Sequence, residues 1–205
     1  MPDVEPTLKQ LGVPPTSIRG RKPFYSVPTI YDPSTQKSVT DTIQILIYLE
    51  DQYPEYTPML FPKASRPLQT AFTDTLFASV FERAIPDMLF GIHDRLCSRS
   101  QTYFRESRER WIGKRLEEVP ADGEECQRVI GAFETVGRWM DMNGGGSVWM
   151  MGASMSFSDV AVAAALTSSE RVVGSEGDMW VAIKEAEGGR WARFLQRFGE
   201  WQTVV

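Results

Sequence analysis

The chain has 205 residues, 42% of them hydrophobic, with a formal net charge of −5 and a pI near 5.1. This length and apolar content suffice for one or two domains with a hydrophobic core. The acidic balance argues against non-specific binding to nucleic acid and to anionic membrane surfaces. An apolar run of about 18 residues is absent, and the acidic N-terminus lacks a signal-peptide pattern. We therefore expect a cytoplasmic protein.

The number and spacing of the cysteine and histidine residues argue against a zinc site. Cys97 and Cys126 lie far apart without a C-x-x-C pattern, and His93 is the single histidine. Zinc sites need about four such ligands at short spacings, and no pattern supports a disulfide. We expect each cysteine to be a small buried apolar residue rather than a nucleophile. We expect His93 to lie on a helix surface or to have its hydrogen bonds satisfied.

The chain begins with a predicted short helix over residues 2–12, in which Val4, Leu8 and Leu11 share one face. Residues 13–22 are rich in proline, glycine and polar residues and are predicted to form a loop.

A β-hairpin is predicted next. Residues 29–31 are β-formers placed directly after Val27-Pro28, residues 32–35 suit a type I turn, and residues 37–40 return as a second strand. Because Pro28 has no N–H, its strand lies at a sheet edge or the ladder ends there. A cis Val27-Pro28 bond would be one reason for that position, although most X-Pro bonds are trans.

A helix follows the hairpin and stops at Pro54. Thr40 or Asp41 suits its N-cap, and a free hydroxyl with free N–H groups at a helix N-terminus attracts an anion. An aspartate at the same place attracts an amine, so Asp41 and Thr42 together suit the zwitterionic end of an amino acid. Plain N-capping is the alternative interpretation. The apolar stripe of this helix consists of Ile43, Leu46, Ile47 and Leu49.

The second half of the chain is predicted to be helical after a proline-rich linker. We divide the chain into a first domain at 1–57, a linker at 58–66 and an all-helical domain at 67–205, which makes the fold class α+β. Pro86 is expected to bend the first of these helices. The predicted helices cover residues 68–90, 100–118, 124–142, 160–166, 174–187 and 190–201.

Residues 156–159 read Ser-Phe-Ser-Asp, which is a capping box that has aspartate in place of the more usual glutamate. Met155 and Val160 occupy the hydrophobic-staple positions around it. We interpret Ser156 and Asp159 as structural residues that start a buried helix.

Several of these stretches together resemble the glutathione transferases. The matching residues are Val27-Pro28-Thr29-Ile30, Asp41-Thr42, Ile45, Tyr48-Leu49 and Met59-Leu60-Phe61-Pro62. A closer likeness, to fungal transferases related to the bacterial β-etherases of lignin breakdown, rests on EPTLKQLGVPPTS, YFRESRERWIGKRLEE and GGRWARFLQRF. The order and spacing of these motifs carry the resemblance over almost the whole chain.

The resemblance implies a thioredoxin-like first domain in which the proline after Val27 is cis. It implies that the Val27 backbone pairs with the cysteinyl part of glutathione, and that Asp41 and Thr42 bind the γ-glutamyl end. Glutathione would be the cosubstrate, added to small hydrophobic or aromatic electrophiles or used to cleave their ethers, in detoxification or secondary metabolism. Homodimers are usual in the family.

The resemblance also implies a truncated first domain, because the family begins with a strand, a helix and a strand that have no counterpart before Met1. The family's thiol-activating residue lies there, so the catalytic residue is unknown. Stand-ins are Thr16, Ser17, Tyr25 and Ser26, which also suit turn or strand positions, and Arg21 or Lys22 suits the glycine carboxylate of glutathione. Without that first strand, residues 29–31 would have an unpaired edge.

Phe72, Phe77 and Phe81 are candidates for an apolar substrate wall, although phenylalanines at helical spacing are also typical of a core. Three hypotheses follow. The chain is a transferase or etherase-like enzyme, a non-catalytic module that binds apolar ligands or a protein, or part of a protein that starts upstream of Met1.

Overall fold

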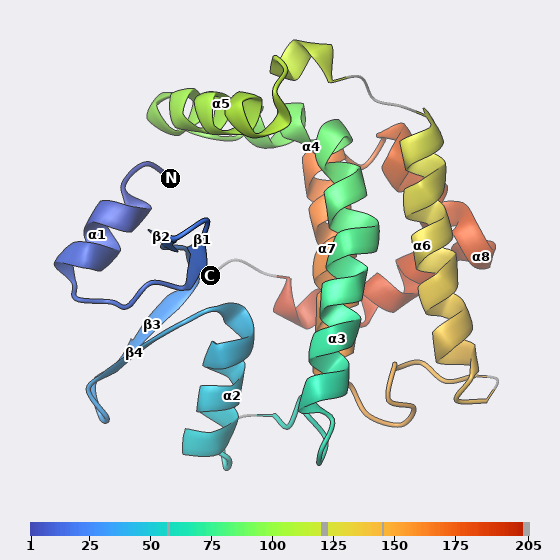
Figure 1. Cartoon of the computed structure of the whole chain (residues 1–205). Helices are drawn as coiled ribbons and strands as arrows, with labels where there is room; N and C mark the ends of the chain where they lie inside the picture. Colours follow the sequence, from blue (N-terminus) through green and yellow to red (C-terminus); the bar gives the residue numbers. More distant parts are fainter. Residues whose placement is uncertain (57, 120–122, 145, 203–205) are drawn as a thin grey trace. The chain divides into compact units, whose positions relative to one another are not determined.

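The computed structural model describes residues 1–56, 58–119, 123–144 and 146–202, except the side chains of residues 81–87, 123 and 125 (Figure 1). The chain forms two compact units. Unit 1 comprises Met1–Met59 with Ser98–Phe104, and unit 2 comprises Leu60–Cys97 with Arg105–Val205.

Within its described residues, unit 1 contains two short helices, two separate antiparallel hairpins and the first part of a longer helix that it shares with unit 2. The pairs are β1 with β2 and β3 with β4. In chain order its elements are α1 (Val4–Gln10), β1 (Ser17–Arg19), β2 (Lys22–Phe24), β3 (Thr29–Asp32), β4 (Lys37–Thr40) and α2 (Thr42–Gln52).

The loop predicted over residues 13–22 is wrong in part, because this stretch contains β1 and the start of β2. Gly20 and Arg21 connect the strands with φ angles of 51° and 68°. Two consecutive positive φ angles define the tight turn whose twist suits a hairpin. The Arg19 guanidinium lies 3.7 Å from the centre of the Phe24 ring across the hairpin, which adds a cation–π contact.

A hydrogen-bond network around Asp32 ties β3 to α2. One Asp32 carboxylate oxygen, Oδ2, accepts hydrogen bonds from the Tyr48 hydroxyl and from the Tyr53 hydroxyl at 2.6 Å, and Oδ1 accepts from the Ser34 N–H at 2.8 Å. The bonds from Tyr48 and Tyr53 hold the pKa of Asp32 well below its usual range. Bonds of this kind favour the charged carboxylate.

The lowered pKa of Asp32 predicts acid sensitivity in unit 1. A carboxyl group whose pKa is lower in the folded state than in the unfolded state stabilises the fold at pH values above its unfolded-state pKa of about 3.9. This contribution decreases below that pH and is lost as the pH falls through the folded-state pKa. We expect β3 and β4 to lose amide-exchange protection as the pH drops below about 4. Asp32→Asn should flatten that dependence, whereas Asp74→Asn on an exposed helix surface should not. Equal pH profiles for Asp32→Asn and the wild type would contradict this prediction.

In the described part of unit 2, every secondary-structure element that follows the first loop is helical apart from an isolated bridge between Trp149 and Gly152, which confirms the α+β class. Its elements in chain order are α3 (Arg66–Leu76), the π-helical turn η1 (Phe77–Phe81), α4 (Glu82–Asp94), α5 (Ser98–Ile112, shared with unit 1), the 3₁₀ turn η2 (Leu116–Glu118), α6 (Gly123–Asp141), α7 (Phe157–Val173), α8 (Asp178–Gln196) and the 3₁₀ turn η3 (Gly199–Trp201).

The core of unit 2 surrounds α7, which contacts α3, α4 and α8 (Figure 1). Val162, Ala163, Ala165 and Leu166 of this helix are all buried, as expected for a helix that is apolar almost all round. Helix α6 packs against α4 and α8, so Val129 and its neighbours complete the core from the other side.

The helices of unit 2 are irregular at two places. The helix continues through Pro86 inside α4, and the irregular segment is η1, directly before α4. Single π-turns of this kind mark local departures from the α-helical hydrogen-bond ladder. Helix α8 is interrupted at residues 186–189, which are non-helical, with φ of 51°, 65° and 81° at Glu187, Gly188 and Gly189. This break agrees with the predicted division into two helices, at 174–187 and 190–201.

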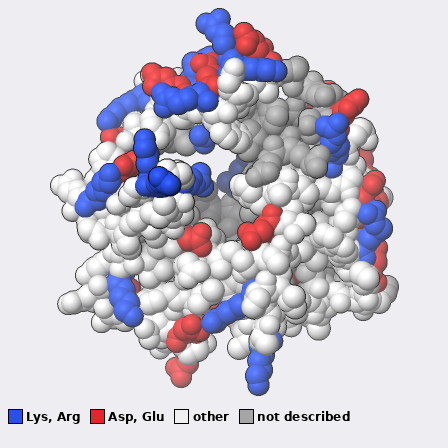
Figure 2. Space-filling model, in the orientation of Figure 1, with Lys and Arg blue, Asp and Glu red and all other residues white. Residues whose placement is uncertain are grey.

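Helix α5 ends earlier than predicted, because Gly113 takes a left-handed C-terminal position with φ of 76°. Its exposed face carries ion pairs: Arg105 lies 3.1 Å from Glu109 and 2.6 Å from Glu117. Figure 2 shows basic and acidic side chains side by side at the top of the view, over α5. Among the described residues, no helix is long and apolar enough to cross a membrane.

Candidate functional site

The register of the second hairpin brings two predicted site segments together. Thr29 of β3 faces Thr40 of β4. Pro28 directly precedes the first of these residues and Asp41 directly follows the second, so both lie at the same end of the hairpin. The Val27-Pro28 peptide bond is cis.

Asp41 occupies the N-cap of α2 with an unusual backbone. Its φ is 80° and ψ is 132°, and a positive φ is uncommon for a residue other than glycine. Its Oδ1 accepts hydrogen bonds from the N–H groups of Ile43 at 3.0 Å and Gln44 at 3.1 Å. Within the described part of the chain, Asp41 Oδ2 has no hydrogen-bond partner. One carboxylate oxygen therefore caps the helix while the other is available to a cation.

Thr42 is the first residue of α2 and is exposed. The next three N–H groups are committed, since Ile43 and Gln44 donate to the Asp41 side chain and Ile45 donates to the Asp41 carbonyl at 2.8 Å. In the region that the structure describes, neither the Thr42 N–H nor its hydroxyl has a partner. These two donors at a helix N-terminus suit an anion.

Val27 is an exposed residue beside this end of the hairpin. The residue is 64% exposed, and β3 pairs with β4 alone among the strands described here. The Val27 N–H and C=O make no hydrogen bond to other described residues. An extended ligand backbone could pair with them in the manner of an added strand.

Four hydroxyl side chains behind this site were not singled out as a group from the sequence. The Thr16 hydroxyl lies 2.8 Å from the Thr40 hydroxyl and accepts hydrogen bonds from the Ser26 N–H and hydroxyl, both at 3.1 Å. The Thr29 hydroxyl donates to the Ser26 carbonyl at 3.1 Å. The cluster ties the segment before Val27 to the end of β4. Its members come from three stretches, at Thr16, at Ser26 with Thr29, and at Thr40, so no single spacing in the sequence could have revealed it.

The remaining stand-ins for a thiol activator have structural contacts. Thr16 and Ser26 belong to the hydroxyl cluster, Ser17 starts β1, and the Tyr25 ring lies 5.3 Å from the Lys9 ammonium. None of these contacts assigns a catalytic residue.

An apolar groove adjoins the Val27 end of the site. It has a volume of about 530 Å³. Apolar side chains of α1, the loop after it and β3 form most of its wall. The lining residues are Leu8, Leu11, Val13, Val27, Thr29, Ile30, Tyr31 and Ser38.

The family model "Glutathione S-transferase, C-terminal domain" matches residues 67–201, which is more than half of the chain. The chain belongs to the glutathione S-transferase family. No curated protein matches it. Solved structures of fungal glutathione transferases resemble this transferase-family chain along its full length.

Three of these structures show how far the similarity extends. In each comparison the matched region covers 100% of this chain and 82% of the other protein's chain. A glutathione S-transferase of Ceriporiopsis subvermispora, solved in complex with glutathione, has 28% sequence identity and a TM-score of 0.93. The transferase GSTFuA2 of Phanerochaete chrysosporium has 33% identity and a TM-score of 0.92. GSTFuA3 of the same fungus has 32% identity and a TM-score of 0.93.

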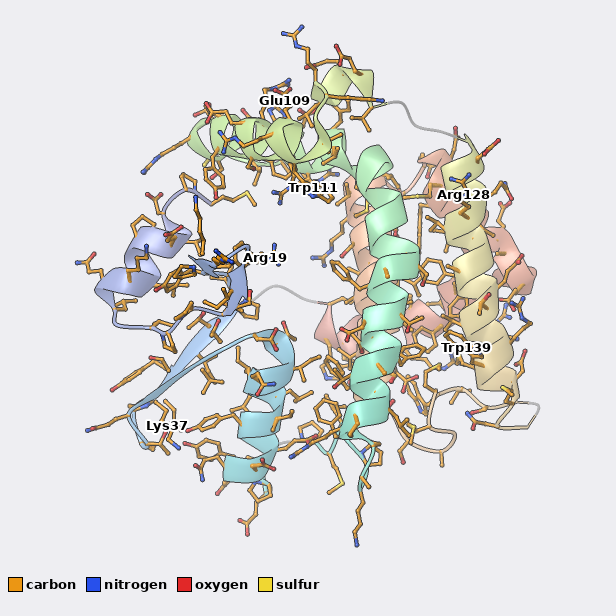
Figure 3. All side chains as sticks on the ribbon, in the orientation of Figure 1. Arg19, Lys37, Glu109, Trp111, Arg128 and Trp139 are labelled. Atoms are coloured by element: carbon orange, nitrogen blue, oxygen red, sulfur yellow. The ribbon has the colours of Figure 1, made fainter. Side chains whose placement is uncertain are left out.

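The predicted substrate wall of this transferase-family chain is only partly described. Phe72 is half-buried against the core of unit 2, where its ring lies 5.8 Å from the ring of Trp139 in an edge-to-face contact. Figure 3 labels Trp139 on α6. Phe77 is 52% exposed in η1, and the Phe81 side chain lies outside the described residues. The substrate wall therefore stays a prediction.

The other candidate side chains do not assemble a metal site. Neither Cys97 nor Cys126 forms a disulfide in the part of the chain that the structure describes, and Cys97 is exposed rather than buried. His93 Nδ1 lies 3.0 Å from Asp94 Oδ1. Among the described residues, no group of three or more His, Cys, Asp or Glu could hold a metal ion.

The capping residues of α7 are fully buried. Asp159 accepts hydrogen bonds from the Ser156 N–H at 2.8 Å and the Ser156 hydroxyl at 2.7 Å through Oδ2, and from the Met150 N–H at 2.7 Å through Oδ1. Burial raises the pKa of Asp159 despite these donors. These contacts give Asp159 a structural role, because they connect the loop that contains Met150 to the start of α7.

Proposed function

We propose that Val27, Pro28, Asp41 and Thr42 bind glutathione, and that the chain acts as a glutathione transferase on small hydrophobic or aromatic electrophiles. The observation that carries the proposal is the pairing of Thr29 with Thr40, which places Pro28 and Asp41 at one end of the hairpin. The solved relative from Ceriporiopsis subvermispora contains glutathione, which supports the same ligand.

The chemistry of the four residues matches the parts of glutathione. Asp41 Oδ2 accepts from the α-ammonium of the γ-glutamyl end, while the Thr42 N–H and hydroxyl donate to its α-carboxylate. The Val27 backbone pairs with the cysteinyl residue, which brings the thiol to the cis-proline end of the hairpin. In the reaction the thiolate forms a bond to carbon of the electrophile and the leaving group departs. The residue that promotes thiol ionisation is unassigned.

The finer parts of the proposal rest on the motifs. The stretches near both ends and in the middle of the chain support a place among the etherase-related transferases, with aryl ethers as substrates. Residues 1–57 would bind glutathione, residues 58–66 would link, and residues 67–205 would supply the substrate wall, with Phe72, Phe77 and Phe81 as candidates. We propose a cytoplasmic homodimer.

A second candidate function is a non-catalytic module that holds an apolar ligand. The apolar groove beside Val27 favours it, because about 530 Å³ lined mainly by aliphatic side chains is large enough for a small molecule. Turnover separates the two candidates, since the module would bind glutathione or an apolar ligand without consuming an activated chloroarene.

The glutathione site predicts a specific response to Asp41→Asn. Asparagine caps a helix as well as aspartate and tolerates a positive φ, so the fold should keep its stability. The variant loses the negative charge that meets the ammonium, so the glutathione Kd in isothermal titration should rise by about tenfold or more. Wild-type affinity in Asp41→Asn would sink the assignment.

Asp41→Ala serves as the contrasting variant, because it removes the cap as well as the charge. We expect the same loss of affinity together with a loss of about 0.5–2 kcal/mol in the free energy of unfolding. Thermal unfolding without ligand therefore separates the binding role of Asp41 from its capping role.

A further inference from the structure

A hollow in unit 2 carries an excess of positive charge that the proposed function does not use. It lies between the end of α6, the loop at residues 146–148 and the second part of α8, and its volume is about 230 Å³. The lining residues are Met140, Asp141, Gly146, Ser147, Val148, Arg190, Arg193, Phe194 and Arg197.

One of the three arginines, Arg190, is fully engaged. Its Nη2 donates to both carboxylate oxygens of Asp141, at 3.0 and 2.9 Å, and its Nη1 donates to the Gly137 carbonyl at 2.8 Å. Its Nε lies 3.6 Å from Glu187. These contacts fix α8 to α6 and leave Arg190 no free charge to offer a ligand.

The other two arginines have no carboxylate partner in the part of the chain that the structure describes. Arg193 Nη1 donates to the Gly188 carbonyl at 2.7 Å, and Arg197 Nη1 donates to the Arg193 carbonyl at 3.3 Å. Their Nη2 and Nε donors are uncommitted. The two residues stand one helical turn apart, where like charges repel.

Among the described residues, the lining contains three guanidinium groups and the carboxylate of Asp141, and Glu187 pairs with Arg190 from outside the lining. The charges of these five groups sum to about +1. A basic residue in the last turn of a helix interacts favourably with the helix dipole, which accounts for a charge at this position. It does not account for two guanidinium forks with unused donors beside a hollow lined by Met140, Val148 and Phe194.

We propose that this hollow binds the phosphate group of a small phosphomonoester. A phosphate dianion relieves the repulsion between Arg193 and Arg197 and accepts from both planar forks. Val148, the exposed apolar side chain of the lining, contacts the ester group, whereas Met140 and Phe194 are almost fully buried. The site lies on residues separate from Val27, Pro28, Asp41 and Thr42, so its test does not depend on glutathione binding.

The test is isothermal titration of the 205-residue protein with phenyl phosphate and with inorganic phosphate at constant ionic strength. We expect saturable binding of phenyl phosphate, and a Kd raised at least about tenfold in Arg197→Met. Methionine keeps the length and helix propensity of the side chain. Arg193→Met should also raise the Kd of phenyl phosphate. Because Arg193 donates to the Gly188 carbonyl as well, Arg193→Met could unfold the protein, and in that case Arg197→Met alone decides the test.

Arg128→Met is the matched control, because Arg128 lies on α6 outside the hollow and pairs with Glu124 at 3.0 Å (Figure 3). It should bind phenyl phosphate like the wild type. The absence of saturable binding, or equal affinity in Arg197→Met and the wild type, would overturn the site. Tighter binding of inorganic phosphate than of phenyl phosphate would overturn the assignment to an ester.

Discussion

Asp159→Ala is expected to lower the free energy of unfolding of unit 2 by about 3–5 kcal/mol. The carboxylate is fully buried and accepts three hydrogen bonds, from the Ser156 N–H, the Ser156 hydroxyl and the Met150 N–H. Its removal leaves these donors without a partner in a dry environment, which costs more than the lost bonds alone.

Denaturant unfolding followed by tryptophan fluorescence measures this loss, since Trp180 and Trp191 are buried in the same core. Asp178→Ala is the control: Asp178 also lies in the first turn of a helix, but it is exposed, so the loss should stay below about 1 kcal/mol. Similar losses in both variants would show that the buried carboxylate has no special role.

Gly91→Ala is expected to destabilise the contact between α4 and α7. A Cβ at Gly91 would lie 2.2 Å from the Val172 carbonyl oxygen and 2.8 Å from Val172 Cγ1. Arg95 Nη1 donates to both the Gly91 and the Val172 carbonyls, at 3.0 and 3.1 Å, and fixes this close approach. Separating the helices should cost about 1–3 kcal/mol or more, above the gain in helix propensity of about 0.5–1 kcal/mol.

Gly131→Ala, a substitution in another helix of the same unit, is expected to raise the free energy of unfolding instead of lowering it. Gly131 lies inside α6, and a Cβ there would meet nothing within 4 Å. The variant should therefore gain about 0.5–1 kcal/mol from helix propensity alone. Thermal unfolding of the two variants side by side checks the prediction, and a stabilised Gly91→Ala would contradict the packing described for α4 and α7.

Much of the fold follows from local signals in the sequence. The strand at residues 37–40 agrees with β4, and the cap at Asp41 with the stop at Pro54 brackets α2. The hairpin of β1 and β2 could not be predicted in this way, because its strands are three residues long and exposed, and Arg21 gives no turn signal. The π-turn η1 has no local sequence signal either.

The candidate site also contains residues that the sequence could predict and residues that it could not. Val27-Pro28 and Asp41-Thr42 stand out as motifs, because the first contains a proline that restricts the backbone and the second places a carboxylate and a hydroxyl at the start of a helix. The hydroxyl cluster around Thr16 and the hollow at Arg193 do not, because they exist only where distant segments converge. The free Thr42 N–H emerges only from the hydrogen bonds of its neighbours.

Burial is distributed unevenly along the chain, and this affects ligand coupling. No residue of α2 is buried, whereas α7 has eight buried residues. Segments with little burial open at a lower free-energy cost than the core, without global unfolding. Asp41 and Thr42 therefore belong to a segment whose closed population a bound ligand raises by mass action. Ligand occupancy of the site and the ordering of α2 would then report on the same equilibrium, so that ligand binding would increase the amide-exchange protection of α2.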